Sequence, residues 1–426
     1  MNLNVPESRF PTVVIVGGGF AGLHTASVLE KANFRVIMVD RHNYHTFQPL
    51  LYQVATAGLE PDSVAYPLRR SLQNTRNFFF RMADVTQVIP EQKILQTSRG
   101  DLRYDYLILA TGSTTNFFGN ANLERFSYPM KSIPEALNLR SLILQQFEKA
   151  TLLRDEQQKN ALMNFVIVGA GPTGVELAGA LAELKQNALP IDYPDLDVEK
   201  MNITLIEAMP KVLGVMSEKS SANAKKYLEN LGVHVLLNTA VADYDGEKLT
   251  YANGDVAYTK TVIWTAGVKG ASVKGPDTAI NARNGRIKTD LYNRVEGYEN
   301  IFAIGDVAEM TSEQLPKGHP MVAQVAIQQG TNLGKNLIRM QSGKALVPFV
   351  YNDKGSMATV GKNKAVVDIG KIHFSGLFAW FIWMFIHLLA LVGFRNKMVT
   401  FFNWVYNYFK YDKGIRLIIR PAEEKV

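Results

Sequence analysis

The 426-residue chain contains no cysteine. This absence excludes structural disulfides, zinc–thiolate sites, iron–sulfur clusters held by cysteine, and any thiol nucleophile or redox-active cysteine pair. It does not identify the compartment, because a chain without thiols is compatible with any of them. Apolar residues make up 47% and charged residues 20% of the chain, which excludes disorder and, at this length, indicates two to three globular domains.

A secretory signal is also missing. Residues 1–11 contain one arginine and no apolar core, and a strand pattern begins directly after them, at 12–16. We therefore expect the chain to begin in the cytoplasm and to fold from its first residues. The formal net charge of +7 indicates an acidic partner, either a membrane surface or a nucleic acid.

Glycine is frequent and is arranged first as GGGFAG at residues 17–22. This turn follows an apolar, β-rich run at 13–16, leads into a predicted helix at 21–31, and precedes a second strand at 35–39 that ends in Asp40. Strand, glycine turn, helix, strand and acid together form the dinucleotide-binding fingerprint.

Each residue type in this turn has a physical reason. Gly17 permits the tight turn, Gly19 lets the backbone approach a pyrophosphate, and Gly22 allows the helix to pack closely on the strand. The helix N-terminus favours phosphate charge, and Asp40 accepts a hydrogen bond from a ribose hydroxyl. The residues predicted to bind this first dinucleotide are Gly17, Gly19, Phe20, Ala21, Gly22 and Asp40.

A second copy of the fingerprint has a strand at 165–168, GAGPTG at 169–174, a helix at 175–184, and a strand at 203–206 that ends in Glu207. Two fingerprints predict two nucleotide domains, one for FAD and one for a nicotinamide dinucleotide. The Glu207 carboxylate favours NAD(H), because it repels the 2′-phosphate of NADP(H), although a nearby base could reverse this preference. The predicted contacts of the second copy are Gly169, Gly171, Gly174 and Glu207.

Three further segments fit two such domains. Strands that run into an Ala-Thr-Gly or Thr-Ala-Gly turn occur at 106–112 and 261–267, and a strand that ends in Gly-Asp occurs at 301–306. In this order the sequence resembles the flavoproteins with two dinucleotide-binding domains, in which such a Gly-Asp contacts the ribityl and phosphate region of the flavin. The resemblance implies further cofactor contacts at Thr111, Gly112, Ala266, Gly267 and Asp306.

The predicted fold class is therefore α/β, with two Rossmann-like dinucleotide-binding domains and a C-terminal membrane-attachment region. We expect the FAD-binding domain at 1–125 and 280–345, the NADH-binding domain at 126–279, and the membrane-anchoring region at 346–426.

The missing thiols restrict the range of possible electron acceptors. Disulfide reductases, sulfide:quinone oxidoreductases and NADH oxidases with an active-site cysteine share this fold but need cysteine, so here the acceptor takes electrons directly from the flavin. Gln324 and Gln328 lie four residues apart on one helical face and offer uncharged donors and acceptors that suit a quinone carbonyl. They belong to an AQxAxQxG motif at residues 323–330, at which the sequence resembles the type II NADH dehydrogenases, the non-pumping NADH:quinone oxidoreductases. Segment 41–55 resembles that family as well.

This resemblance implies that NADH reduces FAD and that the reduced flavin returns two electrons to a membrane quinone, without proton pumping. It implies a flavin and quinone site at Ala323, Gln324 and Gln328, and His42 is a further candidate for a flavin contact. Glu176 matches a family glutamate near the nicotinamide and flavin, so we expect it to position the nicotinamide or to supply a proton. The alternative is a helix-terminal carboxylate that is merely favoured by the helix dipole.

The C-terminal region is apolar and aromatic. From Phe374 to Phe394, 21 residues carry no charge, which is long enough for a transmembrane helix. One face of this stretch is suited to packing on protein, and it consists of Gly376, Ala379, His387 and Ala390. Polar residues then recur every three or four positions over 396–411, at Asn396, Thr400, Asn403, Asn407 and Lys410. Because the remaining positions are mostly aromatic or aliphatic, this pattern predicts an amphipathic helix that lies in an interface.

Two further features of this tail suit a membrane surface. Three of the four tryptophans lie here, as in interfacial aromatic belts: Trp380, Trp383 and Trp404. Six basic residues suit anionic headgroups: Arg395, Lys397, Lys410, Lys413, Arg416 and Arg420. Lys397 or Arg395 could instead stabilise a quinol anion, but we favour headgroup binding.

We therefore expect monotopic attachment to the cytoplasmic side of the cell membrane through 374–411, with a single span or a dimer interface alone as alternatives. A quinone substrate and a homodimer are expected, and a nucleic-acid partner is not. The alternative functions are a soluble NADH-dependent flavoprotein reductase of a protein acceptor and a redox-responsive protein that binds nucleic acid. The apolar tail argues against both, and no basic–aromatic nucleic-acid module is visible.

Overall fold

The computed structural model describes residues 3–73, 77–276, 284–313, 315–410 and 415–418. Contacts between residues divide the chain into two units. Unit 1 consists of Met1–Thr46, Ala65–Thr114 and Val268–Asp353, and unit 2 consists of Phe47–Val64, Thr115–Gly267 and Lys354–Val426. The chain passes between the units after Thr46, Val64, Thr114, Gly267 and Asp353. The third and fourth of these crossings lie at two short strands, β10 (Ser113–Thr115) and β19 (Val268–Gly270).

Unit 1 is built on a five-stranded parallel sheet in the order β21-β9-β1-β2-β5. Its strands are β1 (Thr12–Val16), β2 (Arg35–Asp40), β5 (Phe78–Met82), β9 (Tyr106–Leu109) and β21 (Ile301–Ala303). All five residues of the central strand β1 are buried, and all are β-branched, as expected of a strand that is covered on both faces.

Two helices of unit 1, α1 (Phe20–Val28) and α10 (Ala323–Gln341), pack closely against each other. A Cβ added to Gly330 would lie only 2.3 Å from the Ala21 carbonyl oxygen, so the contact depends on this glycine. The Thr25 hydroxyl donates to the Gly330 carbonyl at 3.1 Å. The remaining elements of unit 1 are short: β3 (Tyr44–Thr46), β4 (Ala65–Pro67), α3 (Leu68–Ser71), β6 (Val85–Ile89), β7 (Ile94–Thr97), β8 (Gly100–Arg103), β20 (Ile287–Thr289) and β22 (Ala308–Met310).

Unit 2 repeats this plan with a second five-stranded parallel sheet, in the order β11-β18-β12-β13-β14. Its strands are β11 (Tyr128–Pro129), β12 (Asn164–Val168), β13 (Asn202–Ile206), β14 (His234–Leu236) and β18 (Thr261–Trp264). An antiparallel sheet accompanies it, with β15 (Val241–Tyr244), β16 (Lys248–Tyr251) and β17 (Val256–Tyr258). The helices from this part of the chain are α4 (Ala121–Phe126), α5 (Ile133–Leu152), α6 (Glu156–Leu162), α7 (Pro172–Asn187), α8 (Leu189–Asp192) and α9 (Glu218–Asn230).

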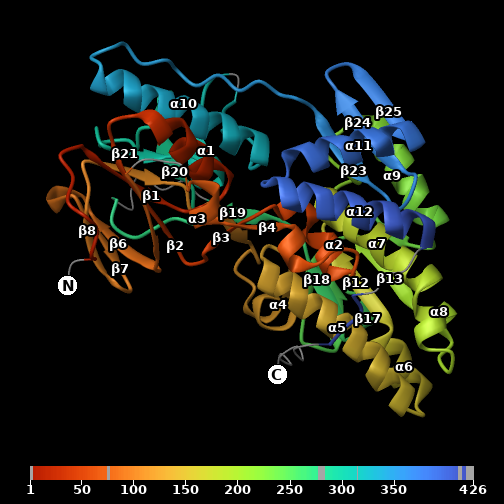
Figure 1. The fold of residues 1–426 in the computed structure, drawn as a ribbon. Coiled ribbons are helices and arrows are strands. Elements are labelled where there is room, and N and C mark those ends of the chain that lie inside the picture. Colours follow the sequence, from red (N-terminus) through yellow and green to blue (C-terminus); the bar gives the residue numbers. More distant parts are fainter. Residues whose placement is uncertain (1–2, 74–76, 277–283, 314, 411–414, 419–426) are drawn as a thin grey trace. The chain divides into compact units, whose positions relative to one another are not determined.

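Unit 2 also contains two segments from elsewhere in the chain. One is the short helix α2 (Leu51–Ala55), and the other is the C-terminal region. The C-terminal region forms an antiparallel sheet and two helices: β23 (Ser356–Thr359), β24 (Ala365–Ile369), β25 (Ile372–Gly376), α11 (Leu377–Ala390) and α12 (Phe394–Lys410). Helices α11 and α12 lie side by side (Figure 1).

The α/β fold class with two Rossmann-like sheets is confirmed, and both glycine turns follow the central strand of their sheet. The uncharged stretch at 374–394 is divided between the end of β25, the 14-residue helix α11 and a turn. Within the described part of the chain, the helices fall short of the length and apolar character required to span a bilayer.

Candidate functional site

The two glycine turns have almost the same backbone geometry. Gly17 has a φ of +107° and Gly169 a φ of +103°, a region that L side chains rarely adopt. A Cβ at Gly17 would lie 2.3 Å from the Ala110 carbonyl oxygen, and one at Gly169 would lie 2.7 Å from the Ala266 backbone nitrogen. Only glycine therefore fits at either position.

The third glycine of each turn brings the helix onto the strand. A Cβ at Gly22 would lie 2.0 Å from the Gly17 carbonyl oxygen, and one at Gly174 would lie 1.9 Å from the Gly169 carbonyl oxygen. This is the close helix–strand approach that the fingerprint predicts.

The middle glycines, Gly19 and Gly171, are the N-caps of α1 and α7 and face open space, because no atom lies within 4 Å of a Cβ built on either. Neither helix has a capping side chain or an acidic residue in its first turn. The backbone N–H groups of both helix starts are therefore open to a phosphate, so the two turns fit a dinucleotide each.

Asp40 and Glu207 fold back onto their own turns in the same way. The Asp40 carboxylate accepts from the Gly18 N–H at 2.7 Å and from the His42 N–H at 2.8 Å. The Glu207 carboxylate accepts from the Ala170 N–H at 2.7 Å and from the N–H two residues after it at 3.0 Å. These bonds fix both carboxylates beside the phosphate site, and each keeps lone pairs for ribose hydroxyls.

The other predicted cofactor residues of unit 1 gather around the ends of β9 and β21. The Ser113 hydroxyl donates to the Asp306 carboxylate at 2.5 Å, and the Thr111 hydroxyl donates to the Ala271 carbonyl at 2.6 Å. Gly112, between them, has a φ of +73° and open space at its Cβ position. His42 and Phe20 lie nearer the first turn. The His42 ring stacks on Tyr44 at 5.2 Å, and Phe20 begins α1.

His45 is a functional candidate that sequence reasoning missed. It is buried beside the first turn, edge-on to Phe20 at 4.9 Å. A carbonyl can only accept, so the contact of Nδ1 with the Gly18 carbonyl oxygen at 3.0 Å places the proton on Nδ1. Burial lowers the pKa of His45 to about 4, so the ring is neutral, and Nε2 has no hydrogen-bond partner among the described residues. This buried acceptor is compatible with a hydroxyl of FAD.

The glutamine motif at the start of α10 divides into different contacts. The Gln328 side chain forms two hydrogen bonds with the backbone of Asn352. It donates to the Asn352 carbonyl at 2.9 Å and accepts from the Asn352 N–H at 3.0 Å. Gln329, which sequence reasoning missed, is buried and accepts from the Gly305 N–H at 2.7 Å, so it holds the Gly-Asp turn that carries Asp306. Ala323 and Gln324 form the first turn of α10.

Two small residues shape the end of β18 in unit 2. Ala266 faces Gly169, as described above, and Gly267 has a φ of +102° with the Phe118 ring 2.9 Å from its Cβ position. Together with Gly171 and Glu207 they belong to the second turn and its surroundings, so all predicted NADH contacts lie in unit 2.

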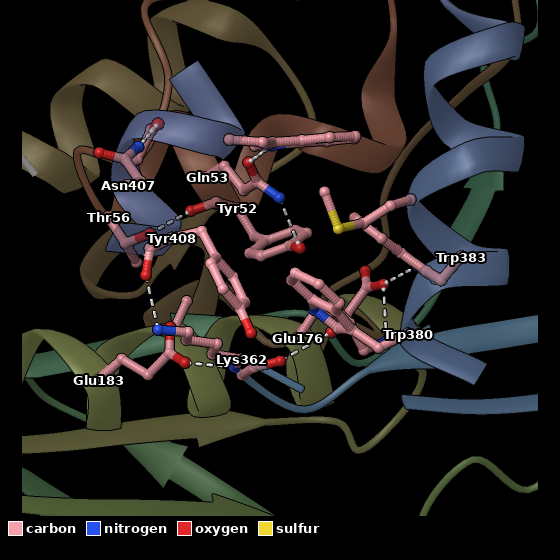
Figure 2. Close-up of a pocket in the computed structure, with 16 residues that line it drawn as sticks. Tyr52, Gln53, Thr56, Glu176, Glu183, Lys362, Trp380, Trp383, Asn407 and Tyr408 are labelled. Atoms are coloured by element: carbon pink, nitrogen blue, oxygen red, sulfur yellow. Dashed lines mark hydrogen bonds between the residues drawn. The ribbon is translucent and has the colours of Figure 1, made fainter. Parts of the chain in front are cut away.

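Glu176 lies in the second turn of α7 and is buried within a cavity of unit 2 (Figure 2). Its Oε1 accepts from the Trp383 indole N–H at 3.2 Å and from the Thr359 backbone N–H at 3.4 Å. Burial raises the pKa of the Glu176 carboxyl to about 8, although these hydrogen bonds lower it. The carboxyl is therefore mostly neutral at pH 7, whereas the alternative reading, a carboxylate that is merely favoured by the helix dipole, needs an ionised group.

The cavity, of about 130 Å³, is lined by five aromatic side chains together with polar and small residues. Three tryptophans come from the C-terminal helices, namely Trp380, Trp383 and Trp404. The two tyrosines are Tyr52 from α2 and Tyr408 from α12 (Figure 2). The Trp404 indole donates to the Gln53 side-chain oxygen at 2.8 Å, and the Gln53 amide donates to the Tyr52 hydroxyl at 2.9 Å. An apolar chamber thus has a polar edge formed by a carboxyl, an amide and a phenol.

The prediction that the tail tryptophans form an interfacial belt is wrong for two of them. Trp383 is 2% exposed and Trp404 is 8% exposed, and each indole N–H is bound inside unit 2. The physical reason is that a buried indole N–H needs an acceptor, and Glu176 and Gln53 provide one.

The predicted amphipathic helix exists as α12, but its polar face points into the protein rather than toward headgroups. Asn396 and Asn407 donate to the Asp62 and Gly58 carbonyls, Asn403 donates to the Glu60 carboxylate, and Thr400 is fully buried. The exposed side carries large apolar side chains: Phe394, Met398, Phe401, Phe402, Val405, Tyr406 and Phe409. Helix α11 adds further exposed apolar residues: Leu377, Phe378, Phe381, Phe385, Ile386 and Leu389.

Several basic residues of the tail also have protein partners. Arg395 pairs with Asp62 at 3.4 Å, and the Lys397 ammonium donates to the Leu389 carbonyl near the end of α11 at 2.7 Å. Arg416 pairs with Asp192 in unit 2. Lys410 is exposed in the last turn of α12. Tyr411, Lys413 and Arg420 lie outside the described residues.

Comparison with known proteins gives matches over most of the chain. The family described as "Pyridine nucleotide-disulphide oxidoreductase" matches residues 11–330, and the "NDH2 C-terminal domain" matches residues 354–410. The type II NADH:quinone oxidoreductase Ndh of Mycobacterium tuberculosis is 37% identical over 419 residues, covering 94% of this chain and 89% of the relative. The type II NADH:quinone oxidoreductase of Staphylococcus aureus is 29% identical over 367 residues, covering 83% and 88%.

A solved structure of NDH2 from Plasmodium falciparum, in complex with NADH, has the same fold. It matches with a TM-score of 0.88 and 22% sequence identity, covering 97% of this chain and 100% of that one.

Proposed function

Since the chain belongs to the type II NADH:quinone oxidoreductases, and so carries out FAD-dependent oxidation of NADH with reduction of quinone, we propose how its two units divide this work. Unit 1 holds FAD, and unit 2 holds NADH and supplies a proton to the quinone. The residues of each role are taken in turn below, from the binding turns to the cavity.

In unit 1 the FAD pyrophosphate lies at the start of α1 and the ribose meets Asp40, because the helix start is open and the carboxylate is fixed beside it. The bound flavin supplies two-electron chemistry between NADH and quinone. Asp306, held by Ser113, and the buried His45 acceptor offer hydrogen bonds to further hydroxyls of FAD. The first turn of α10, with Gln324, completes the proposed site.

In unit 2 the start of α7 binds the NADH pyrophosphate and Glu207 binds the adenosine ribose. Two observations support NADH over NADPH. The carboxylate is held in place by two backbone N–H groups, and the nearby basic residue Lys211 is paired with Glu218 at 2.7 Å. A paired lysine does not offset the repulsion between Glu207 and a 2′-phosphate.

Glu176 supplies a proton in quinone reduction. The overall reaction converts NADH, one proton and quinone to NAD⁺ and quinol, so two electrons arrive from NADH while one proton must come from solvent through the protein. A carboxyl with a pKa of about 8 is neutral at pH 7 and can donate its proton to an anionic oxygen of the reduced quinone, which gives the quinol, after which a proton from solvent restores the carboxyl. The single observation that carries this proposal is the buried Glu176 carboxyl at the wall of an apolar aromatic chamber.

The apolar outer side of α11 and α12 attaches the protein to the membrane surface, peripherally and on the cytoplasmic side. Support comes from the exposed phenylalanines of both helices, among them Phe385 at 63% and Phe409 at 76% exposed. The polar residues of α12 are used inside unit 2, so this side is left without its own polar cover.

The proton role is tested with Glu176→Gln by following the two half-reactions separately. NADH should bleach the flavin of the variant at a rate within about threefold of wild type, whereas recolouring by a short-chain quinone should slow about 100-fold. Glu229→Gln, which changes an exposed acid of α9, is the matched control and should leave both rates unchanged. Unchanged recolouring in Glu176→Gln would remove the proton role.

The membrane role is tested by flotation with vesicles containing anionic lipid. Wild type should float with the vesicles, and replacing Phe385, Phe402 and Phe409 by serine should leave most of the protein at the bottom of the gradient while flavin reduction by NADH persists. Flotation of the triple variant equal to wild type would contradict attachment through this surface.

A further inference from the structure

The Glu176 carboxyl is bound asymmetrically. Both of its hydrogen bonds reach the same oxygen, Oε1, from the Trp383 indole at 3.2 Å and from the Thr359 backbone at 3.4 Å (Figure 2). The other oxygen, Oε2, has no hydrogen-bond partner among the described residues. The two oxygens are therefore not equivalent.

This asymmetry decides where a proton resides. A neutral carboxyl has one carbonyl oxygen, which accepts, and one hydroxyl, which donates. Two N–H groups directed at Oε1 stabilise the form in which Oε1 is the carbonyl, and this leaves the proton on Oε2. Since Glu176 lines the cavity, Oε2–H is the group that can donate to a quinol oxygen there.

We propose that Trp383 is a positioning residue for quinone reduction: its indole N–H holds Glu176 Oε1 as an acceptor and thereby keeps the transferable proton on Oε2. The proposal rests on the proton role of Glu176 given above. It adds a residue of α11, the helix with the apolar outer side, to the machinery of proton supply.

Trp383 is well held for such a task. It is 2% exposed and stacks on the His387 ring at 4.1 Å, with an angle of 22° between the rings. The His387 ring is in turn hydrogen bonded to the Trp383 carbonyl at 2.8 Å, and Tyr52 lies edge-on at 6.5 Å. Because α11 fixes the indole, the orientation of the Glu176 proton depends on how α11 packs against the rest of unit 2.

The other titratable groups around Glu176 either form hydrogen bonds with other residues or are neutral at pH 7. Lys362 donates through its ammonium to the Tyr408 carbonyl at 2.7 Å, and its backbone N–H donates to the Glu183 carboxylate. Burial raises the pKa of Tyr52 and lowers that of His387 to about 4, so neither is charged at pH 7. Among the described residues, Trp383 is thus the only side chain with a hydrogen bond to Glu176.

The test is the pH dependence of quinone-driven flavin recolouring in Trp383→Phe. An indole N–H stabilises the ionised carboxylate, so its removal should raise the midpoint of the alkaline decline, near pH 8 in wild type, by about one pH unit. The rate below the midpoint should fall three- to tenfold, because only the Thr359 N–H then remains to hold the proton on Oε2. Trp380→Phe changes another tryptophan of the same helix and cavity and should leave the midpoint unchanged. A Trp383→Phe midpoint equal to that of wild type would overturn the proposal.

A second replacement covers the case in which phenylalanine leaves a void and the variant does not fold. Benzothienylalanine at position 383 keeps the bicyclic ring but has sulfur in place of the N–H, and it should give the same shift. Infrared spectra provide a readout apart from turnover. The carbonyl band of the neutral carboxyl, identified by its absence in Glu176→Gln, should move to higher frequency when the indole donor is lost, and an unmoved band would overturn the proposal.

The double variant separates this proposal from the one on which it rests. In the Glu176→Gln background, Trp383→Phe should cause no further change in the pH profile, whereas an equal loss in both backgrounds would mean that Trp383 acts only on packing. If Glu176→Gln itself leaves recolouring and its pH profile unchanged, the proton role of Glu176 fails. The infrared shift would in that case still report whether Trp383 holds Oε1.

Discussion

The two glycine turns of this chain are nearly identical in backbone, yet they are covered by different elements. Gly17 and Gly169 share their φ to within a few degrees, and the acids of both turns accept from equivalent backbone N–H groups. In unit 1 the helix after the turn is covered by α10, whereas in unit 2 α7 contacts β23. The turn thus provides the geometry for a dinucleotide, and the elements packed on the helix after it determine which other groups surround the site.

The difference is clearest two residues after the third glycine of each turn. Unit 1 has His24 there, half-buried and bound to the Phe20 carbonyl of its own helix at 2.8 Å. Unit 2 has Glu176 there, buried by C-terminal elements and bound to them. The equivalent positions of the two repeated units therefore differ in their surroundings, because only in unit 2 does a later segment of the chain build a chamber around this residue.

The largest effect is expected from the same change in both turns. Gly19→Ala places a methyl group where we propose that the FAD pyrophosphate approaches the start of α1, so the variant should purify without flavin and lose more than 100-fold in activity. Gly171→Ala should keep its flavin and instead raise the KM for NADH at least tenfold. The measurements are the flavin-to-protein ratio and steady-state kinetics. Loss of flavin in both variants would contradict the division of ligands between the units.

A second pair of substitutions compares how closely later segments pack on the helix after each turn, namely α10 on α1 in unit 1 and the region of β23 on α7 in unit 2. A Cβ at Gly330 would lie 2.3 Å from the Ala21 carbonyl, whereas one at Gly179 would lie 3.0 Å from the Gly361 nitrogen. Gly330→Ala should lower the free energy of unfolding by about 1–3 kcal/mol, because backbone must move. Gly179→Ala should stay within about 1 kcal/mol, since the gain in helix propensity offsets a smaller strain. Denaturant unfolding of both variants measures these free energies. Equal losses of unfolding free energy would show that the two helices are packed equally closely.

How much of this could be predicted follows from the range of the interactions. Both turns, their acids and the parallel strands depend on local patterns, so the sequence predicts them correctly. The helical pattern of 396–411 is likewise local, and α12 exists. Periodicity defines a polar face, however, and does not say whether water, lipid or protein meets it. The partners of that face lie at 58–62, more than 300 residues away in sequence.

The site shows the same limit. Glu176 is a candidate because it matches a glutamate of the family that the sequence resembles, but its partner Trp383 is 207 residues away, and the sequence pattern assigns that tryptophan to a membrane belt. In the glutamine motif, spacing favours Gln324 and Gln328 because they share a face. It gives no sign that Gln329 is the buried one that holds Gly305.

The pH dependence of stability sharpens the comparison at Glu176. Its pKa is about 8 when folded and near 4.5 when unfolded, so between these values the folded state binds more protons. The stabilisation from this residue is therefore complete below about pH 4.5 and declines as pH rises through 8, by roughly 2–4 kcal/mol. The difference in unfolding free energy between wild type and Glu176→Gln should change by this amount from pH 5 to pH 9. Trp380→Phe removes no titrating group and should give a constant difference, and a constant difference for Glu176→Gln would place its pKa near the ordinary value.

The smallest effect is expected at the two ribose acids, where the turns are most alike. Glu207→Gln removes the charge that repels a 2′-phosphate but keeps an oxygen for the backbone N–H groups, so the protein should fold normally. The ratio of kcat/KM for NADPH to that for NADH should rise about tenfold, which corresponds to about 1.4 kcal/mol. Asp40→Asn is the matched change in the first turn. It should weaken retention of flavin without altering this ratio, because in the proposed division only the second turn meets the nicotinamide dinucleotide. If Asp40→Asn moved the ratio and Glu207→Gln did not, the two turns would have to exchange their ligands.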